Sequence, residues 1–178
     1  MNFIQALVLS VIEGVTEFLP ISSTGHLILF SKVLKVEQTE FLKTFEIFIQ
    51  LGAILSVVLL YRKSFLTNFS RWKKILTAFF PTAVIGFIFY KIVKTFFLGN
   101  SLLTISSLVI GGIILIVFEK NHNKESNINI DSLSYKDAAI IGICQSISIV
   151  PGVSRAAATI VGGLVLGLSR KNAVEFSF

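Results

Sequence analysis

The chain has 178 residues, of which 53% are hydrophobic and only 15% are charged, and its formal net charge is +6. Soluble domains are usually about a quarter charged. This deficit excludes a disordered chain and, despite the positive balance, a nucleic-acid-binding domain. A single cysteine excludes a disulfide scaffold. The remaining class is an all-α polytopic integral membrane protein, with one membrane domain over residues 1–178 and the lipid bilayer as its solvent.

The first predicted element is a broken helical hairpin over residues 1–31. Pro20 ends a helix, because its ring clashes with the preceding turn, and Ser22, Ser23 and Thr24 offer N-cap hydroxyls for the helix that restarts. Each half is too short to span a bilayer, so we expect a re-entrant hairpin that dips into the membrane and returns. The segment lacks the positive start and the cleavage site of a signal peptide, and we expect it to be retained.

Three charge-poor runs predict membrane-spanning helices at residues 44–61, 75–97 and 102–118. A basic linker, 62–74, follows the first span, and a polar linker, 119–137, follows the third. Because two spans separate the linkers, both lie on one side of the membrane. The basic linker contains no acidic residue, so the positive-inside rule places that side in the cytoplasm.

A second broken hairpin is predicted at residues 138–168. Pro151 and Gly152 form its break, and Ser154 is the candidate N-cap of the helix that follows. Each half is again too short to span, so this segment is also predicted to be re-entrant.

The two hairpins suggest an internal duplication. Each precedes a helix with an early glutamate, Glu46 in repeat 1 (residues 1–61) and Glu175 in a partial repeat 2 (residues 138–178). The predicted topology brings the first hairpin in from outside and the second from inside, which is typical of inverted-topology repeats. Broken helices at membrane depth are tolerated around a polar cavity, where two helix N-termini favour an anion. Glu46 either supports this cavity or caps its helix.

Two glutamates interrupt the apolar N-terminal segment. Glu13 and Glu17 are four residues apart, so they share one face of a helix. Carboxylates within a membrane are functional by default, and this pair suits general acid–base chemistry or a divalent cation held through oxygen. The alternative is a structural pair of carboxylates whose hydrogen bonds are made by polar neighbours.

A hydroxyl and an imidazole follow the first break. Ser23 and His26 are three residues apart, which places them on one helical turn and suggests a nucleophile with its base. The alternative is a histidine that only makes a structural hydrogen bond.

Arg155 is a lone cation in an apolar stretch directly after the second break. Its planar fork matches phosphate oxygens. The alternative is an ion pair with Glu13 or Glu17, and both arrangements can hold in turn: paired when the site is empty, and on phosphate when it is filled.

These residues belong to three longer motifs, EGVTEFLPISSTGHLIL (from Glu13), TFEIFIQLGAI (44–54) and PGVSRAAATI (151–160). On these motifs the chain resembles the undecaprenyl-diphosphatase family, the bacitracin-resistance proteins of bacterial membranes. The resemblance implies hydrolysis of undecaprenyl diphosphate to undecaprenyl phosphate and inorganic phosphate, which recycles the lipid carrier of peptidoglycan synthesis and confers bacitracin resistance. It also implies a divalent cation, Mg²⁺ or Ca²⁺, and a multi-pass protein of the plasma membrane whose active site faces outward.

The resemblance also assigns roles by position. It implies Glu17, Ser23, His26 and Arg155 as catalytic residues, Ser22, Thr24, Ser154, Arg155 and Thr159 as phosphate-binding residues, and Glu13 and Glu17 as metal ligands. Whether Ser23 or His26 is the nucleophile stays open. A polyprenyl diphosphate lipid is the expected partner, and a homodimer is also compatible with the sequence.

Two features depart from the family pattern. Ala156 and Ala157 stand where the family usually has Ser and Gly, which removes one phosphate-facing hydroxyl. The chain also stops at Phe178, inside an apolar helix without a C-cap signal, where family members continue, so we expect a fragment. The rival function is a lipid-phosphate transporter or flippase that uses the same midplane cavity.

Overall fold

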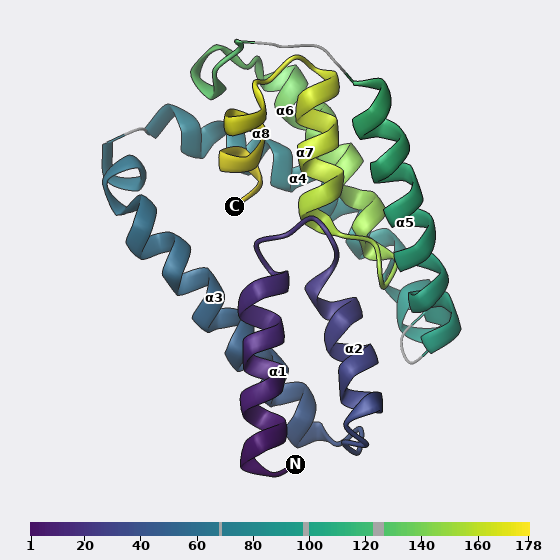
Figure 1. The fold of residues 1–178 in the computed structure, drawn as a ribbon. Helices are drawn as coiled ribbons and strands as arrows, with labels where there is room; N and C mark the ends of the chain where they lie inside the picture. The colour runs from purple at the N-terminus through teal and green to yellow at the C-terminus, as the bar shows by residue number, and fades with distance from the viewer. Residues whose placement is uncertain (68, 98–99, 123–126) are drawn as a thin grey trace.

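A computed structural model describes residues 1–67, 69–97, 100–122 and 127–178, and these residues are mainly helical (Figure 1). The elements in chain order are α1 (Phe3–Thr16), α2 (Ser23–Val33), α3 (Glu40–Thr67), α4 (Phe69–Ile92), the π-helical turn η1 (Val93–Phe97), α5 (Ser101–Asn121), the 3₁₀ turn η2 (Ile130–Ser132), α6 (Tyr135–Gln145), the 3₁₀ turn η3 (Ser146–Ile149), α7 (Arg155–Val165) and α8 (Arg170–Ser177).

Three of the described helical segments are long and apolar enough to cross a membrane. They run over Glu40–Arg62, Phe69–Phe97 and Ser101–Asn121, with mean hydropathies of 1.9, 1.8 and 2.5. Their large apolar side chains are exposed, as Phe87 and Leu60 show with 85% and 79% of their surface open. A surface of this kind is stable against lipid and unfavourable in water. The three predicted segments are therefore confirmed as helices that are long and apolar enough to span, with boundaries a few residues longer than expected.

The basic linker is helical in its described part and does not form a loop. Helix α3 continues to Thr67 and α4 begins at Phe69, while residue 68 lies outside the described residues. The reason is local: residues 62–74 contain no glycine or proline, and lysine and arginine are good helix formers.

The polar linker is bound to the start of α4. Lys74 is buried, and its Nζ donates to the carbonyl oxygens of Ile130 and Asp131 at 3.0 and 2.6 Å. Arg71 donates to both carboxylate oxygens of Asp131 at 2.8 Å, and this hydrogen bonding holds the pKa of Asp131 below its usual value. The two linkers therefore meet at one end of the bundle, as the span count predicts; residues 123–126 lie outside the described part.

The first hairpin forms as a helix, a turn and a helix. Helix α1 ends at Thr16, four residues before Pro20, and residues 17–21 form the turn. This offset has a steric cause, because a proline ring clashes with the carbonyl four residues before it, here that of Thr16. Helices α1 and α2 lie side by side (Figure 1), and Leu9 and Leu27 are buried between them.

The second hairpin packs tightly on α4. Helices α6 and α7 contact each other, and Ile141 and Leu164 lie in a core that includes Ala78 of α4. At Gly142 a Cβ atom would lie 1.9 Å from the carbonyl oxygen of Ala78. Only glycine fits at this contact between α4 and α6.

A serine N-cap follows each break: Ser22, one of the three candidates at the first, and Ser154, the candidate at the second. The Ser22 hydroxyl accepts from the Gly25 N–H at 3.4 Å, with Ser22 in the left-handed region at φ 66°. The Ser154 hydroxyl accepts from the Ala157 N–H at 3.1 Å. Helices α2 and α7 thus begin at the two breaks, and Figure 1 shows the α1–α2 turn close to the start of α7.

Candidate active site

Glu17 joins the two hairpins. It follows the last residue of α1, and its side chain is 15% exposed. One carboxylate oxygen, Oε2, accepts a 2.5 Å hydrogen bond from the Ser23 hydroxyl at the start of α2. The other, Oε1, accepts from Nη2 of Arg155 at 3.2 Å. Three residues singled out from the sequence therefore form one cluster, in which Arg155 lies 138 residues from Glu17 along the chain.

Arg155 is the first residue of α7 and projects into a large cavity. Its side chain is 52% exposed, so the contact with Glu17 leaves much of the guanidinium open to the cavity. Of the two carboxylates considered as its partner, the structure pairs it with Glu17. The first N–H groups of α7 also lack helical partners, and together with Arg155 they favour an anion at this point.

Glu13 lies one turn before Glu17 and is buried, with 1% of its surface exposed. Among the described residues, neither of its carboxylate oxygens has a hydrogen-bond partner. A buried carboxylate without partners is unfavourable unless it is neutral or binds a cation. Among the described residues, polar neighbours therefore satisfy Glu17 but not Glu13.

A divalent cation fits this donor set. The described residues contain no group of three or more histidines, cysteines or acids placed to hold a metal. Mg²⁺, however, is often bound through one or two carboxylates, with water and substrate phosphates completing its shell. Glu17 lines the large cavity and Glu13 lies buried one turn behind it with unpartnered oxygens, so the two supply carboxylate donors of that kind.

The expected pairing of Ser23 with His26 is not formed. Ser23 donates to Glu17, and Nδ1 of His26 lies 2.9 Å from the carbonyl oxygen of Ser22, one turn earlier. A carbonyl only accepts, so Nδ1 carries the proton in this contact. Residues three apart share a helix face, but Ser23 is the first residue of α2 and its side chain turns towards the preceding loop.

The remaining predicted phosphate-binding residues separate into two groups. Ser22, Thr24 and Ser154 line the large cavity, and Gln50 donates to the Thr24 hydroxyl at 3.5 Å. Thr159 is buried away from it, with its hydroxyl 2.6 Å from that of Ser177. Thr159 therefore packs α7 against α8 and does not reach the cavity.

The large cavity has a volume of about 1150 Å³ and lies between the hairpins, α3 and α5. Glu46 lines it, which supports the cavity role over the capping role left open by the sequence. Sequence reasoning missed eight polar residues of the lining: Lys32, Gln38, Lys43, Gln50, Asn100, Ser101, Thr104 and Ser148. A signal existed in α3, where Lys43, Glu46 and Gln50 recur at spacings of three and four and form a polar stripe on an apolar helix.

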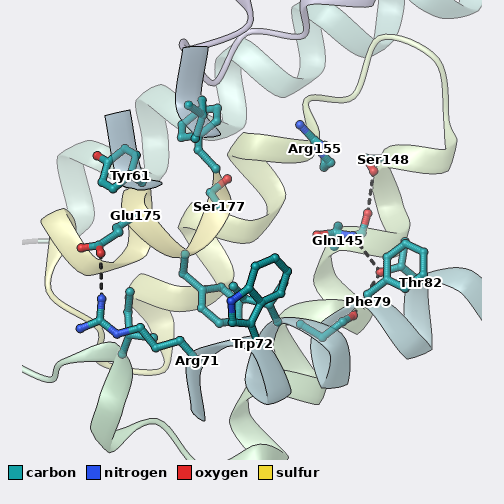
Figure 2. Close-up of a pocket in the computed structure, with 16 residues that line it drawn as sticks. Tyr61, Arg71, Trp72, Phe79, Thr82, Gln145, Ser148, Arg155, Glu175 and Ser177 are labelled. Carbon is teal, nitrogen blue, oxygen red and sulfur yellow. Dashed lines mark hydrogen bonds and ion pairs between the residues drawn. The ribbon is translucent and has the colours of Figure 1, made fainter. Parts of the chain in front are cut away.

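A second, smaller cavity of about 460 Å³ is lined in part by Ser148 and Arg155, as Figure 2 shows, and the large cavity shares these two residues. Glu175 lines this second cavity and forms an ion pair with Arg71 at 2.9 Å. The two early glutamates that suggest a duplication therefore have different environments: Glu46 faces the large cavity, and Glu175 is ion-paired.

Comparison with known proteins gives one consistent result. The family described as "Bacitracin resistance protein BacA" matches residues 6–178. The chain is 50% identical over 175 residues to the "Undecaprenyl-diphosphatase" of Aquifex aeolicus, covering 98% of this chain and 68% of that protein. Proteins of the same name from a Sulfurihydrogenibium strain and from Wolinella succinogenes are 54% and 48% identical, each over 100% of this chain and 70% of their own length.

Proposed function

The chain belongs to the bacitracin resistance protein BacA family, and we propose on this premise that it hydrolyses undecaprenyl diphosphate to undecaprenyl phosphate and inorganic phosphate. The reaction recycles the lipid carrier of cell-wall synthesis, in line with the bacitracin resistance that names the family. The observation that carries the proposal is the cluster in which Glu17 contacts both Ser23 and Arg155.

Arg155 is the principal phosphate ligand in this proposal. Its guanidinium offers a planar fork of N–H donors that matches phosphate oxygens, and it is open to the cavity. The N-terminal ends of α2 and α7 add backbone N–H donors, and the hydroxyls of Ser22, Thr24 and Ser154 lie along the same wall. When the diphosphate binds, Arg155 exchanges part of its contact with Glu17 for the phosphate.

Ser23 is the nucleophile that the geometry favours. Its hydroxyl oxygen attacks the terminal phosphorus, the bond from that phosphorus to the bridging oxygen breaks, and undecaprenyl phosphate leaves with the bridging oxygen. Glu17 takes the hydroxyl proton across the 2.5 Å hydrogen bond. Water then hydrolyses the phosphoserine and releases inorganic phosphate. Arg155 stabilises the charge on the equatorial oxygens during both steps.

His26 is the alternative nucleophile, through a phosphohistidine. Its Nδ1 is engaged with the Ser22 carbonyl, which leaves Nε2 as the nitrogen free to react. This alternative is weaker, because His26 does not line the large cavity whereas Ser23 does.

Glu13 and Glu17 would hold a divalent cation, Mg²⁺ or Ca²⁺, at the end of α1. A bound cation supplies positive charge that polarises the phosphoryl oxygens. The support for this assignment is the buried Glu13 carboxylate, which has no hydrogen-bond partner among the described residues.

We also propose that both hairpins are re-entrant and form inverted repeats, with the active site open to the outer face of the plasma membrane. Support comes from the two matched helix–break–helix units, whose broken ends meet at Glu17 and Arg155. Irregular backbone at membrane depth is tolerated where it lines a polar cavity, and both breaks line this one. A homodimer stays a prediction.

Release of inorganic phosphate from undecaprenyl diphosphate by the purified protein in detergent micelles tests the function. We expect turnover that chelator abolishes and added Mg²⁺ or Ca²⁺ restores. Arg155→Ala should remove most of it, while Arg170→Ala, which removes an exposed arginine paired with Glu119 outside the cavity, should not. Lack of turnover by the unmodified protein, or full turnover by Arg155→Ala, would contradict the proposal.

A trapped phosphoenzyme distinguishes the two nucleophiles. An acid-stable phosphoryl group indicates Ser23, and an acid-labile group indicates His26. We expect the acid-stable form, and we expect it to be absent from Ser23→Ala.

A further inference from the structure

We propose that Lys32 and Lys43 form a phosphate-binding entrance to the large cavity, which captures the diphosphate group of the substrate and passes it to Arg155. The inference rests on the proposed function and extends it to residues outside the motifs that carry the family resemblance. Both lysines line the same cavity as Glu17 and Arg155. Lys32 lies in the last turn of α2, and Lys43 in the first turn of α3.

Lys32 lies at a distance from the reacting groups along the cavity wall. Lys32 follows Ser23 by nine residues on α2, which corresponds to about 14 Å along the helix axis at about 1.5 Å per residue. The Lys32 Nζ contacts the hydroxyl of Ser101, which also lines the cavity, so the charge of Lys32 lies against the lining. The lining therefore carries cationic side chains at Arg155 and, separately, at the two lysines.

Among the described residues, neither lysine has a partner that neutralises its charge strongly. The Lys32 Nζ contacts the hydroxyl of Ser101 at the start of α5, which is a neutral group. Lys43 pairs with Glu40 at 2.6 Å, but the two side chains are 60% and 88% exposed. Exposed ion pairs of this kind contribute little free energy, so a multiply charged anion can displace the Glu40 carboxylate from Lys43.

The charges of the lining favour an anion beside the two lysines. Two carboxylates line the cavity, those of Glu17 and Glu46. Glu17 is already paired with Arg155, so only the negative charge of Glu46 opposes the two positive charges of the lysines. A carboxylate along the path repels a diphosphate, and cations at the entrance offset this repulsion. Charges of one sign at the mouth of a cleft raise the local concentration of the oppositely charged substrate.

The phosphate that these lysines bind could belong to the substrate or to a neighbouring anionic phospholipid. The position inside the cavity lining favours the substrate, since a group that serves only to hold the bilayer surface needs no contact with the reaction chamber. The two sources make different predictions, because inorganic diphosphate competes at a substrate site and leaves a membrane anchor unaffected.

The test compares Lys32→Gln, Lys43→Gln and the double variant with Lys35→Gln, a matched control that removes an exposed lysine three residues from Lys32 and outside the cavity lining. Turnover of undecaprenyl diphosphate is measured in neutral detergent micelles at low and high salt. Binding of inorganic diphosphate to the same proteins is measured by calorimetry, and binding to phosphatidylglycerol vesicles by sedimentation.

We expect kcat/KM to fall about fivefold for each single variant and more than about tenfold for the double variant, mainly through KM, because charges at a rim act on association. The effect should shrink at high salt, since the screening length falls from about 10 Å at about 0.1 M to about 3 Å at about 1 M. Lys32→Arg, which keeps the positive charge, should keep the activity that Lys32→Gln loses. In the Gln variants, the affinity for inorganic diphosphate should fall in parallel with kcat/KM.

Unchanged KM and unchanged diphosphate affinity in the double variant would overturn the inference, as would a loss confined to vesicle binding. A protein that binds diphosphate through the lysines but releases no phosphate would retain the entrance and refute the proposed function. A protein that neither binds diphosphate nor releases phosphate would refute both.

Discussion

The short hydrogen bond between Ser23 and Glu17 predicts that these two residues act as one unit. The Oγ–Oε2 distance is 2.5 Å, in the range of charge-assisted bonds, and Ser23 is only 7% exposed, so little water competes for the hydroxyl. Loss of a positioned base typically slows a reaction by about 10²–10⁴-fold. Glu17→Gln keeps the shape and an oxygen for Arg155 but removes the base, so we expect a loss in this range, or about 3–5 kcal/mol of transition-state stabilisation.

A double-mutant cycle tests whether the two residues are coupled. Ser23→Ala should lose at least as much activity as Glu17→Gln, and the double variant should lose no more than the worse single variant, because residues of one catalytic unit are strongly non-additive. The readout is phosphate release from undecaprenyl diphosphate. Matched controls are Ser10→Ala, whose hydroxyl bonds only within α1, and Glu37→Gln, an exposed acid outside the cavity. Losses that multiply in the double variant, or an active Ser23→Ala, would refute the coupling.

Two further predictions concern packing. Gly142→Ala places a Cβ against the Ala78 carbonyl and should destabilise the protein by about 1–3 kcal/mol. The control is Gly86→Ala, which should not destabilise it, because nothing lies within 4 Å of a Cβ at that position. Thermal unfolding in detergent measures the stability of both variants. Thr159→Val removes the hydrogen bond to Ser177 and should cost about 1 kcal/mol of stability with normal phosphate release per folded molecule. A selective loss of activity without loss of stability would restore Thr159 to the phosphate site.

The hairpins were predictable because their signals are local. A proline ends a helix because it has no N–H to donate and its ring clashes with an earlier carbonyl. A serine shortly after it caps the first N–H groups of the next helix. Pro20 with Ser22, and Pro151 with Ser154, therefore specify a break and a restart within a few residues. The three spans were predictable for a similar reason, since length and hydropathy are sums over neighbouring residues.

The partners of the site residues were not predictable in the same way. Helical spacing predicts that Ser23 pairs with His26. In the structure the Ser23 hydroxyl instead donates a hydrogen bond to Glu17, six residues earlier across the turn. The choice depends on how the turn at 17–21 folds back, which spacing does not encode. Likewise, the sequence left Arg155 with two candidate carboxylates, and only the approach of the two hairpins selects Glu17.

By itself, the sequence determined the membrane class, the broken hairpins and the identity of the polar residues that an apolar chain retains at a cost. Tertiary structure decided which of these residues share a cavity. Glu46 and Glu175 occupy similar places after their hairpins, yet one faces the large cavity and the other pairs with Arg71. Lys32 and Lys43 join the site only because the end of α2 and the start of α3 border the same space. Burial and contact depend on which helices pack together, and those contacts connect residues that no local pattern links.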